Sequence, residues 1–174
     1  MVDTALWIAS LTGGTAVLAS WVTSRGTARA ACIQADAAAN TQRTERLRET
    51  RRTAYANLVE QAQRIGELYW LVSDVHRTGC EQEQLPALRD LRFRLRDEYG
   101  KLRHLVWIVT LEGPSEVADA ADGLRRSTAP PYDALLAAIE GDPDAAETFN
   151  KCYEPFWQSV LNFVRAAQTA LQWM

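Results

Sequence analysis

Apolar positions recur every three or four residues along the second and third quarters of the chain, the spacing of amphipathic helices. The first clear stripe begins at Tyr55 and runs to Val75, before Gly79. A second stripe runs from Leu85 to Val109, and Pro86 falls in its first turn, where proline is tolerated. The pattern therefore predicts two long helices. We interpret the apolar run at residues 105–111 as the fully covered end of the second one.

Breaks and capping residues divide the rest of the chain into shorter helices. Gly113 and Pro114 end the second helix, and Ser115 is a suitable N-cap for a third. Pro130 and Pro131 predict another break before residues 132–140. A last helix is predicted to open with Asp142 as its cap and Pro143 as its first residue, and Pro155 should bend or divide it. The predicted fold class is all-α, with an antiparallel helical bundle at residues 53–174.

The first part of the chain has a different pattern, with 21 consecutive uncharged residues from Thr4 to Ser24. A helix rising about 1.5 Å per residue over that length crosses the roughly 30 Å hydrocarbon layer of a bilayer. Trp7 and Trp21 lie near its ends, where indole rings favour the headgroup region, and Arg25 and Arg29 follow as cationic anchors. Residues 1–24 are therefore predicted to be a transmembrane helix.

Two other interpretations of this stretch remain open. A cleaved secretion signal requires a positive N-terminal region, and the chain instead begins with Met1, Val2 and Asp3. A core helix of a soluble domain normally keeps a polar stripe, which is missing here. Small residues at Ser10, Gly13 and Gly14 would let two such helices approach closely, so this part of the chain is a candidate helix–helix contact.

The segment between the predicted anchor and the bundle, residues 25–52, is rich in Ala and Arg and poor in large apolar residues. It is predicted to be a helical stalk with no core to pack against. Because the positive charges follow the anchor rather than precede it, the positive-inside rule places the long C-terminal part in the cytoplasm. The predicted location is the cell membrane, with a single pass.

Charge and chemistry narrow the functional classes. The formal net charge is −3 with both signs closely mixed, which gives no argument for binding nucleic acid. Three widely spaced cysteines, Cys32, Cys80 and Cys152, suggest free thiols in a reducing compartment. The two histidines, His76 and His104, lie in no metal-binding or catalytic motif. We therefore expect no catalytic residue, no metal and no cofactor.

Aromatic side chains form a stripe along the predicted last helix. Its members are Phe149, Tyr153, Phe156, Trp157 and Phe163. Ligand sites in helical bundles are built between helices, so the stripe is a candidate ligand groove, although the same spacing is also that of plain core.

Several segments together resemble a group of proteins. An N-terminal span rich in small residues, an Arg/Ala-rich stalk, RTERLRETRRTAYANLV and EGPSEVADAADGL are similar to uncharacterised small single-pass membrane proteins of Streptomyces and related actinobacteria. The resemblance implies an anchor followed by a cytoplasmic helical bundle and carries no activity with it.

These observations lead to a first hypothesis of a non-enzymatic, membrane-tethered interaction or scaffold module. Its partners would be the membrane and, through its helices, a second copy or another protein. The alternatives are a bundle that senses a small molecule or lipid, a soluble helical domain whose first helix is core, and an enzyme of unknown type.

Overall fold

The structure of the protein is a computed structural model that describes the backbone of residues 2–78 and 81–172, and the side chains of residues 33–78 and 83–172. Throughout these described residues the chain forms helices and turns, without a strand. The all-α class predicted from the periodicity is confirmed. The chain divides into two compact units, Met1–Arg46 and Leu47–Met174.

Helix α1 spans Val2–Thr78 and contributes to both units. In the first unit, every side chain from residue 33 to residue 46 is exposed. The predicted transmembrane stretch, residues 4–24, lies where side chains are not described. Among the residues whose side chains are described, no helix is both long enough and apolar enough to cross a bilayer.

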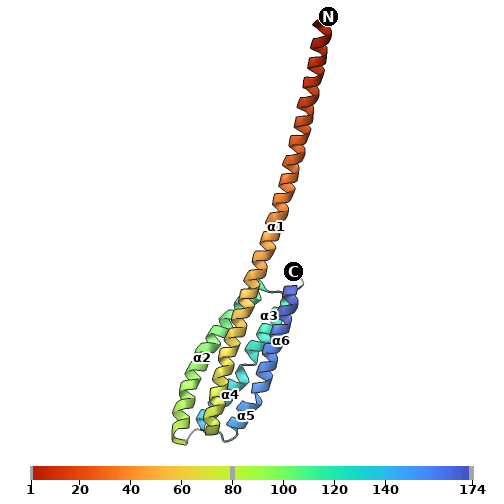
Figure 1. Cartoon of the computed structure of the whole chain (residues 1–174). Helices are drawn as coiled ribbons and strands as arrows, with labels where there is room; N and C mark the ends of the chain where they lie inside the picture. The colour runs from red at the N-terminus through yellow and green to blue at the C-terminus, as the bar shows by residue number, and fades with distance from the viewer. Residues whose placement is uncertain (1, 79–80, 173–174) are drawn as a thin grey trace. The chain divides into compact units, whose positions relative to one another are not determined.

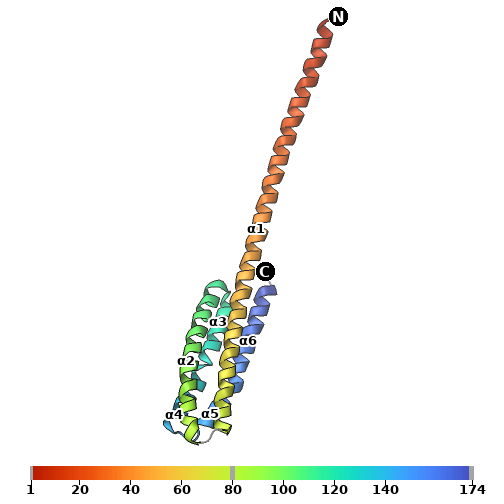
Figure 2. The same ribbon diagram turned by 60° about the vertical axis from the view of Figure 1, so that its left-hand side comes forward.

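The second unit is a bundle built from the C-terminal part of α1 and five further helices. These are α2 (Glu81–Glu112), α3 (Ser115–Arg126), α4 (Ala129–Glu140), α5 (Ala145–Lys151) and α6 (Tyr153–Gln172). Figures 1 and 2 show α2 beside α1 and running in the opposite direction, with α6 on the other side of α1. The predicted antiparallel arrangement of the long helices is confirmed.

The core of this unit is formed by the predicted apolar stripes. On α1 the fully buried side chains include Leu58, Ile65, Tyr69 and Val72, and on α2 they include Leu95 and Val109. Helices α3 to α6 add further buried side chains: Val117, Leu124, Leu135, Phe149, Phe156 and Phe163. Each of these large side chains stabilises the fold by about 1.5–3 kcal/mol through the apolar area removed from water.

One glycine shows how closely the helices pack. Gly66 is buried on α1, and a Cβ atom added there would lie 2.5 Å from Cζ2 of Trp157 on α6. That separation is too short for any side chain heavier than hydrogen. Glycine at this position therefore lets the indole of Trp157 lie directly against the backbone of α1.

Three helix starts differ from the predictions. Pro114, not Ser115, is the N-cap of α3, because its extended backbone directs its carbonyl oxygen at the N–H groups of Val117 and Ala118, both 3.1 Å away. Pro130 and Pro131 lie inside the first turn of α4 rather than before the helix. Backbone N–H groups in a first turn have no acceptor within the helix, so a proline there sacrifices no hydrogen bond.

The third difference concerns the start of α5. This helix begins at Ala145 with Asp144 as its N-cap, two residues later than predicted. The Asp142 carboxylate instead accepts a hydrogen bond from the Asp144 backbone N–H at 3.0 Å, which closes a turn before the helix. The predicted division of the last helix is confirmed, since the chain breaks at Cys152 and Pro155 falls in the first turn of α6.

The end of α2 is not covered as predicted. Within residues 105–111, Val106 and Val109 are buried, but Trp107 is 63% exposed and Leu111 is 82% exposed. Within the described bundle no helix covers these two side chains, although Trp107 lines a hollow against α3, so a run that is apolar on all faces leaves both largely in water.

Candidate interaction surface

The most unusual feature of the bundle is the outer face of α2. Phe93, which is 62% exposed, lies fourteen residues before Trp107, and Leu111 follows one turn later. Residues at these spacings project from one side of a helix. Single exposed apolar residues are ordinary. Trp107 and Leu111 are one turn apart and Phe93 lies about 21 Å further along the same face, so we treat this face as a candidate interaction surface.

A row of arginines runs beside these apolar side chains. Arg89, Arg96 and Arg103 are each seven residues apart, all are exposed, and within the described part of the chain none forms an ion pair. Among the neighbouring charges of α2, Lys101 lies 2.6 Å from Glu98 and Arg94 lies 3.8 Å from Asp90, whereas the exposed Asp97 forms no ion pair with another described residue. The outer face of α2 thus combines large apolar side chains with three unpaired arginines and one unpaired acid, Asp97.

Gly100 lies midway between Phe93 and Trp107. It is exposed, and a Cβ atom added there would have no neighbour within 4 Å. Glycine inside a helix costs about 1 kcal/mol relative to alanine, and no contact inside this chain explains it. Beside it is a shallow hollow lined by Arg96, Asp97, Lys101, His104 and Leu105.

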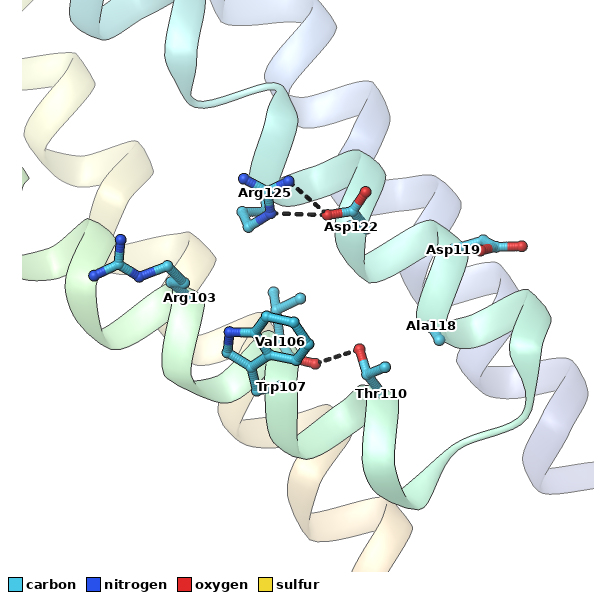
Figure 3. A pocket seen from close by; sticks show the side chains of 8 residues that line it. All are labelled: Arg103, Val106, Trp107, Thr110, Ala118, Asp119, Asp122 and Arg125. Atoms are coloured by element: carbon cyan, nitrogen blue, oxygen red, sulfur yellow. Dashed lines mark hydrogen bonds and ion pairs between the residues drawn. The ribbon is translucent and has the colours of Figure 1, made fainter.

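A second hollow, of about 490 Å³, lies between α2 and α3 and is shown in Figure 3. Arg103, Trp107 and Thr110 line its α2 side, and Asp119, Asp122 and Arg125 line its α3 side. The Arg125 guanidinium donates a hydrogen bond to the Asp122 carboxylate at 2.8 Å, and this bond, together with the nearby Arg126, lowers the pKa of Asp122. The α3 side of this hollow is therefore mainly charged, whereas its α2 side combines the indole of Trp107 with the polar side chains of Arg103 and Thr110.

Polar groups inside the bundle have structural partners. The phenol oxygens of Tyr69 and Tyr99 are 2.8 Å apart, and burial raises the pKa of both groups. Gln61 donates hydrogen bonds to the backbone carbonyl and the carboxylate of Glu98. These contacts join α1 to α2.

Two buried polar atoms lack a partner in the described structure, the Tyr55 hydroxyl and Nε2 of His76. Burial lowers the pKa of His76, whose ring lies 6.4 Å from that of Phe149. His104 is exposed on α2, far along the chain from His76. Among the described residues, no group of three or more His, Cys, Asp or Glu side chains is placed to hold a metal ion.

The structure separates the members of the predicted aromatic groove. Phe149, Phe156 and Phe163 are fully buried in the core, where the rings of Phe149 and Phe156 pack edge to face on Tyr69 at 5.6 and 5.0 Å. Tyr153 and Trp157 are half-buried beside them. Three of the five side chains therefore serve as core, which the helical spacing also allowed.

The other predicted site residues lie where side chains are not described. They are the anchor residues Trp7, Trp21, Arg25 and Arg29, and the small residues Ser10, Gly13 and Gly14. The outer face of α2 was not identified from the sequence. The seven-residue spacing of its Phe93, Gly100 and Trp107 row and of its arginine row was the available indication.

No protein-family model matches the chain, and no curated protein or solved structure is significantly similar to it.

Proposed function

We propose that the protein is a non-enzymatic interaction module, tethered to the cell membrane by residues 1–24 and presenting its helical bundle to the cytoplasm. The observation that carries this proposal is the outer face of α2, where Phe93, Trp107 and Leu111 are exposed beside three unpaired arginines. Leaving these apolar groups in water has a cost that a partner would remove. A catalytic role has no comparable support among the described residues.

The tether is supported by the sequence alone. The uncharged stretch has the length of a bilayer span and has tryptophans at both ends and arginines after it. The resemblance to small single-pass membrane proteins of actinobacteria agrees with this assignment. The stalk, whose described side chains are all exposed from residue 33 to residue 46, would separate the bundle from the bilayer.

The interaction role is tested by photo-crosslinking in intact cells. A benzoylphenylalanine placed at Trp107 should give adducts of higher mass, because that side chain would face the partner. The same group at Asn162, an exposed position on α6, is the matched control and should give none. Equal labelling at both positions, or none at either, would contradict the proposal.

The tether is tested separately by deleting residues 1–24. The full chain should be recovered with membranes, and the shortened chain should be soluble. If both chains distribute in the same way, residues 1–24 are not the anchor.

A further inference from the structure

We propose that the hollow between α2 and α3 binds a small, flat organic acid, with its apolar body against the indole of Trp107 and its carboxylate at the end that holds Arg103 and Arg125. The inference goes beyond the proposed function, because the ligand is a small molecule rather than a partner protein. It follows from the order of the side chains along the two walls, from the charge at one end, and from the size of the hollow.

The two walls of the hollow carry matching rows of side chains. In order toward the turn between the helices, the rows are Arg103, Trp107 and Thr110 on α2 and Arg125, Asp122 and Ala118 on α3. Steps of three and four residues place the members of each row on one side of their helix. The hollow is therefore a short groove between two facing rows (Figure 3).

The turn between the helices sets which members of the two rows are level. Residues 113–114 join α2 to α3, and the two helices run in opposite directions (Figures 1 and 2). Thr110 and Ala118 lie within four residues of this turn, whereas Arg103 and Arg125 lie ten and eleven residues from it. At about 1.5 Å per residue, both arginines are roughly 15 Å from the turn. Both therefore lie at the same end of the groove.

This end of the groove carries an excess of positive charge. Arg103 forms no ion pair with any residue that the structure describes. The nearby Asp122 is already occupied on both carboxylate oxygens, because Oδ1 accepts a hydrogen bond from Arg125 at 2.8 Å and Oδ2 contacts Arg126. One acid therefore stands among three arginines.

The other acid of the lining does not cancel this charge. Asp119 is exposed on α3, and Figure 3 shows its carboxylate pointing away from Trp107 and from the arginines. A cationic ligand would gain one solvent-exposed carboxylate at the rim and would meet guanidinium groups at the far end. The groove therefore favours an anion.

Arginine is well suited to hold the carboxylate of such a ligand. A guanidinium can donate two parallel hydrogen bonds to a carboxylate, and these charge-assisted bonds are about twice as strong as neutral ones. Arg103 has no ion pair to give up within the described chain. Arg125 uses its Nε and one terminal nitrogen on Asp122, and its other N–H groups are left for a ligand.

The middle of the groove suits a flat apolar body. Trp107 is 63% exposed, and an aromatic ring packs on indole in an offset or edge-to-face arrangement. Val106 and Ala118 line the groove beside it. Its volume of about 490 Å³ lies in the range of small-molecule sites. Arg103 and Trp107 are about 6 Å apart along α2, so one small molecule can contact both.

A naphthalene acid and its neutral amide test the site on the full chain in lipid nanodiscs. The probes are 2-naphthoate and 2-naphthamide, which share a shape and differ in charge, and empty nanodiscs measure the probe that enters the lipid. Binding is followed by the indole N–H resonances, among which the Trp107 peak is the one lost in Trp107→Leu. We expect 2-naphthoate to shift this peak with a dissociation constant of about 1 mM, typical of a ligand with roughly a dozen non-hydrogen atoms. The amide should bind about 10-fold more weakly.

Two substitutions separate the two ends of the groove, and backbone resonances of α3 report binding in each variant. Arg103→Gln should weaken 2-naphthoate about 5-fold and leave 2-naphthamide nearly unchanged, because only the acid uses the guanidinium. Trp107→Leu should weaken both probes about 5-fold, because both use the indole. Arg89→Gln is the matched control, an exposed arginine about 21 Å further along α2, and should change neither constant.

Three results would overturn the inference: no shift of the Trp107 peak, equal binding of the acid and the amide, or equal losses in Arg103→Gln and Arg89→Gln. Circular dichroism of each variant checks that these exposed substitutions leave the fold intact. Photo-crosslinking at position 107 reads the protein partner independently. A chain that forms the crosslink but binds no acid loses the ligand site alone, whereas a chain that binds the acid without a crosslink keeps it.

Discussion

Two helical glycines should respond to alanine in opposite ways. Gly123 lies inside α3, and a Cβ atom added there would meet nothing within 4 Å. Gly123→Ala should therefore stabilise the fold by about 1 kcal/mol, the difference in helix propensity. At Gly66 the same gain in helix propensity is opposed by steric overlap, because the new Cβ would lie 2.5 Å from Cζ2 and 3.3 Å from Cε2 of Trp157.

The indole of Trp157 cannot move aside without disturbing other rings. It packs edge to face on Phe156 at 5.5 Å and on Tyr153 at 6.3 Å. Overpacking of this kind costs roughly 1–3 kcal/mol. Because that cost exceeds the propensity gain over most of its range, Gly66→Ala should lose about 1 kcal/mol net.

The assay is thermal unfolding of the full chain, followed by near-ultraviolet circular dichroism, which reports the aromatic core. A change of 1 kcal/mol moves Tm by roughly 3 °C in a chain of this size, so the two variants should differ by about 6 °C. In a Trp157→Leu background the contact is absent, and Gly66→Ala should become stabilising. A rise in Tm for Gly66→Ala in the wild-type background would refute the close packing of α1 and α6.

Three further predictions concern the buried polar groups. Tyr69→Phe should lower the free energy of unfolding by about 1–2 kcal/mol, because it leaves the buried hydroxyl of Tyr99 without its 2.8 Å partner; urea titration measures this loss. Tyr55→Phe should be neutral or slightly stabilising in the same titration, since it removes a buried hydroxyl that has no partner. The lowered pKa of His76 means that the unfolded chain binds the extra proton first, so stability should be lost as the pH falls below about 6.5; the urea midpoint of His76→Phe should vary less between pH 7.5 and 5.5.

Periodicity predicted the parts of the fold that depend on repeated burial. The stripes on α1 and α2 are buried as expected except at Leu85, the first residue of the second stripe, which is 37% exposed; the spacing of Leu58, Ile65 and Val72 leaves one face available for a core. Helix starts were less predictable. Pro114 and Asp144 compete with Ser115 and Asp142 as caps, and the choice between neighbours depends on the turn geometry rather than on residue type.

The candidate surface was missed because apolar residues were expected to be covered. Trp107 and Leu111 belong to an apolar run, and only the three-dimensional arrangement shows that the helices of the described bundle leave both largely exposed. Phe156 is the opposite case: the sequence suggested that it lines a ligand groove, and the structure shows it fully buried in the core. A stripe on a helix indicates that one face is covered, but the sequence does not say by which element.

In the proposed function, residues 1–24 hold the bundle at a membrane. The most direct measurement is the fraction of the full chain that stays in the membrane pellet after an alkaline carbonate wash, compared with a Val17→Asp variant. A charge in the middle of a bilayer span is unfavourable by about 3 kcal/mol, so the wild type should stay in the pellet and the variant should be largely released. Complete release of the wild type, or equal retention of both chains, would contradict the account.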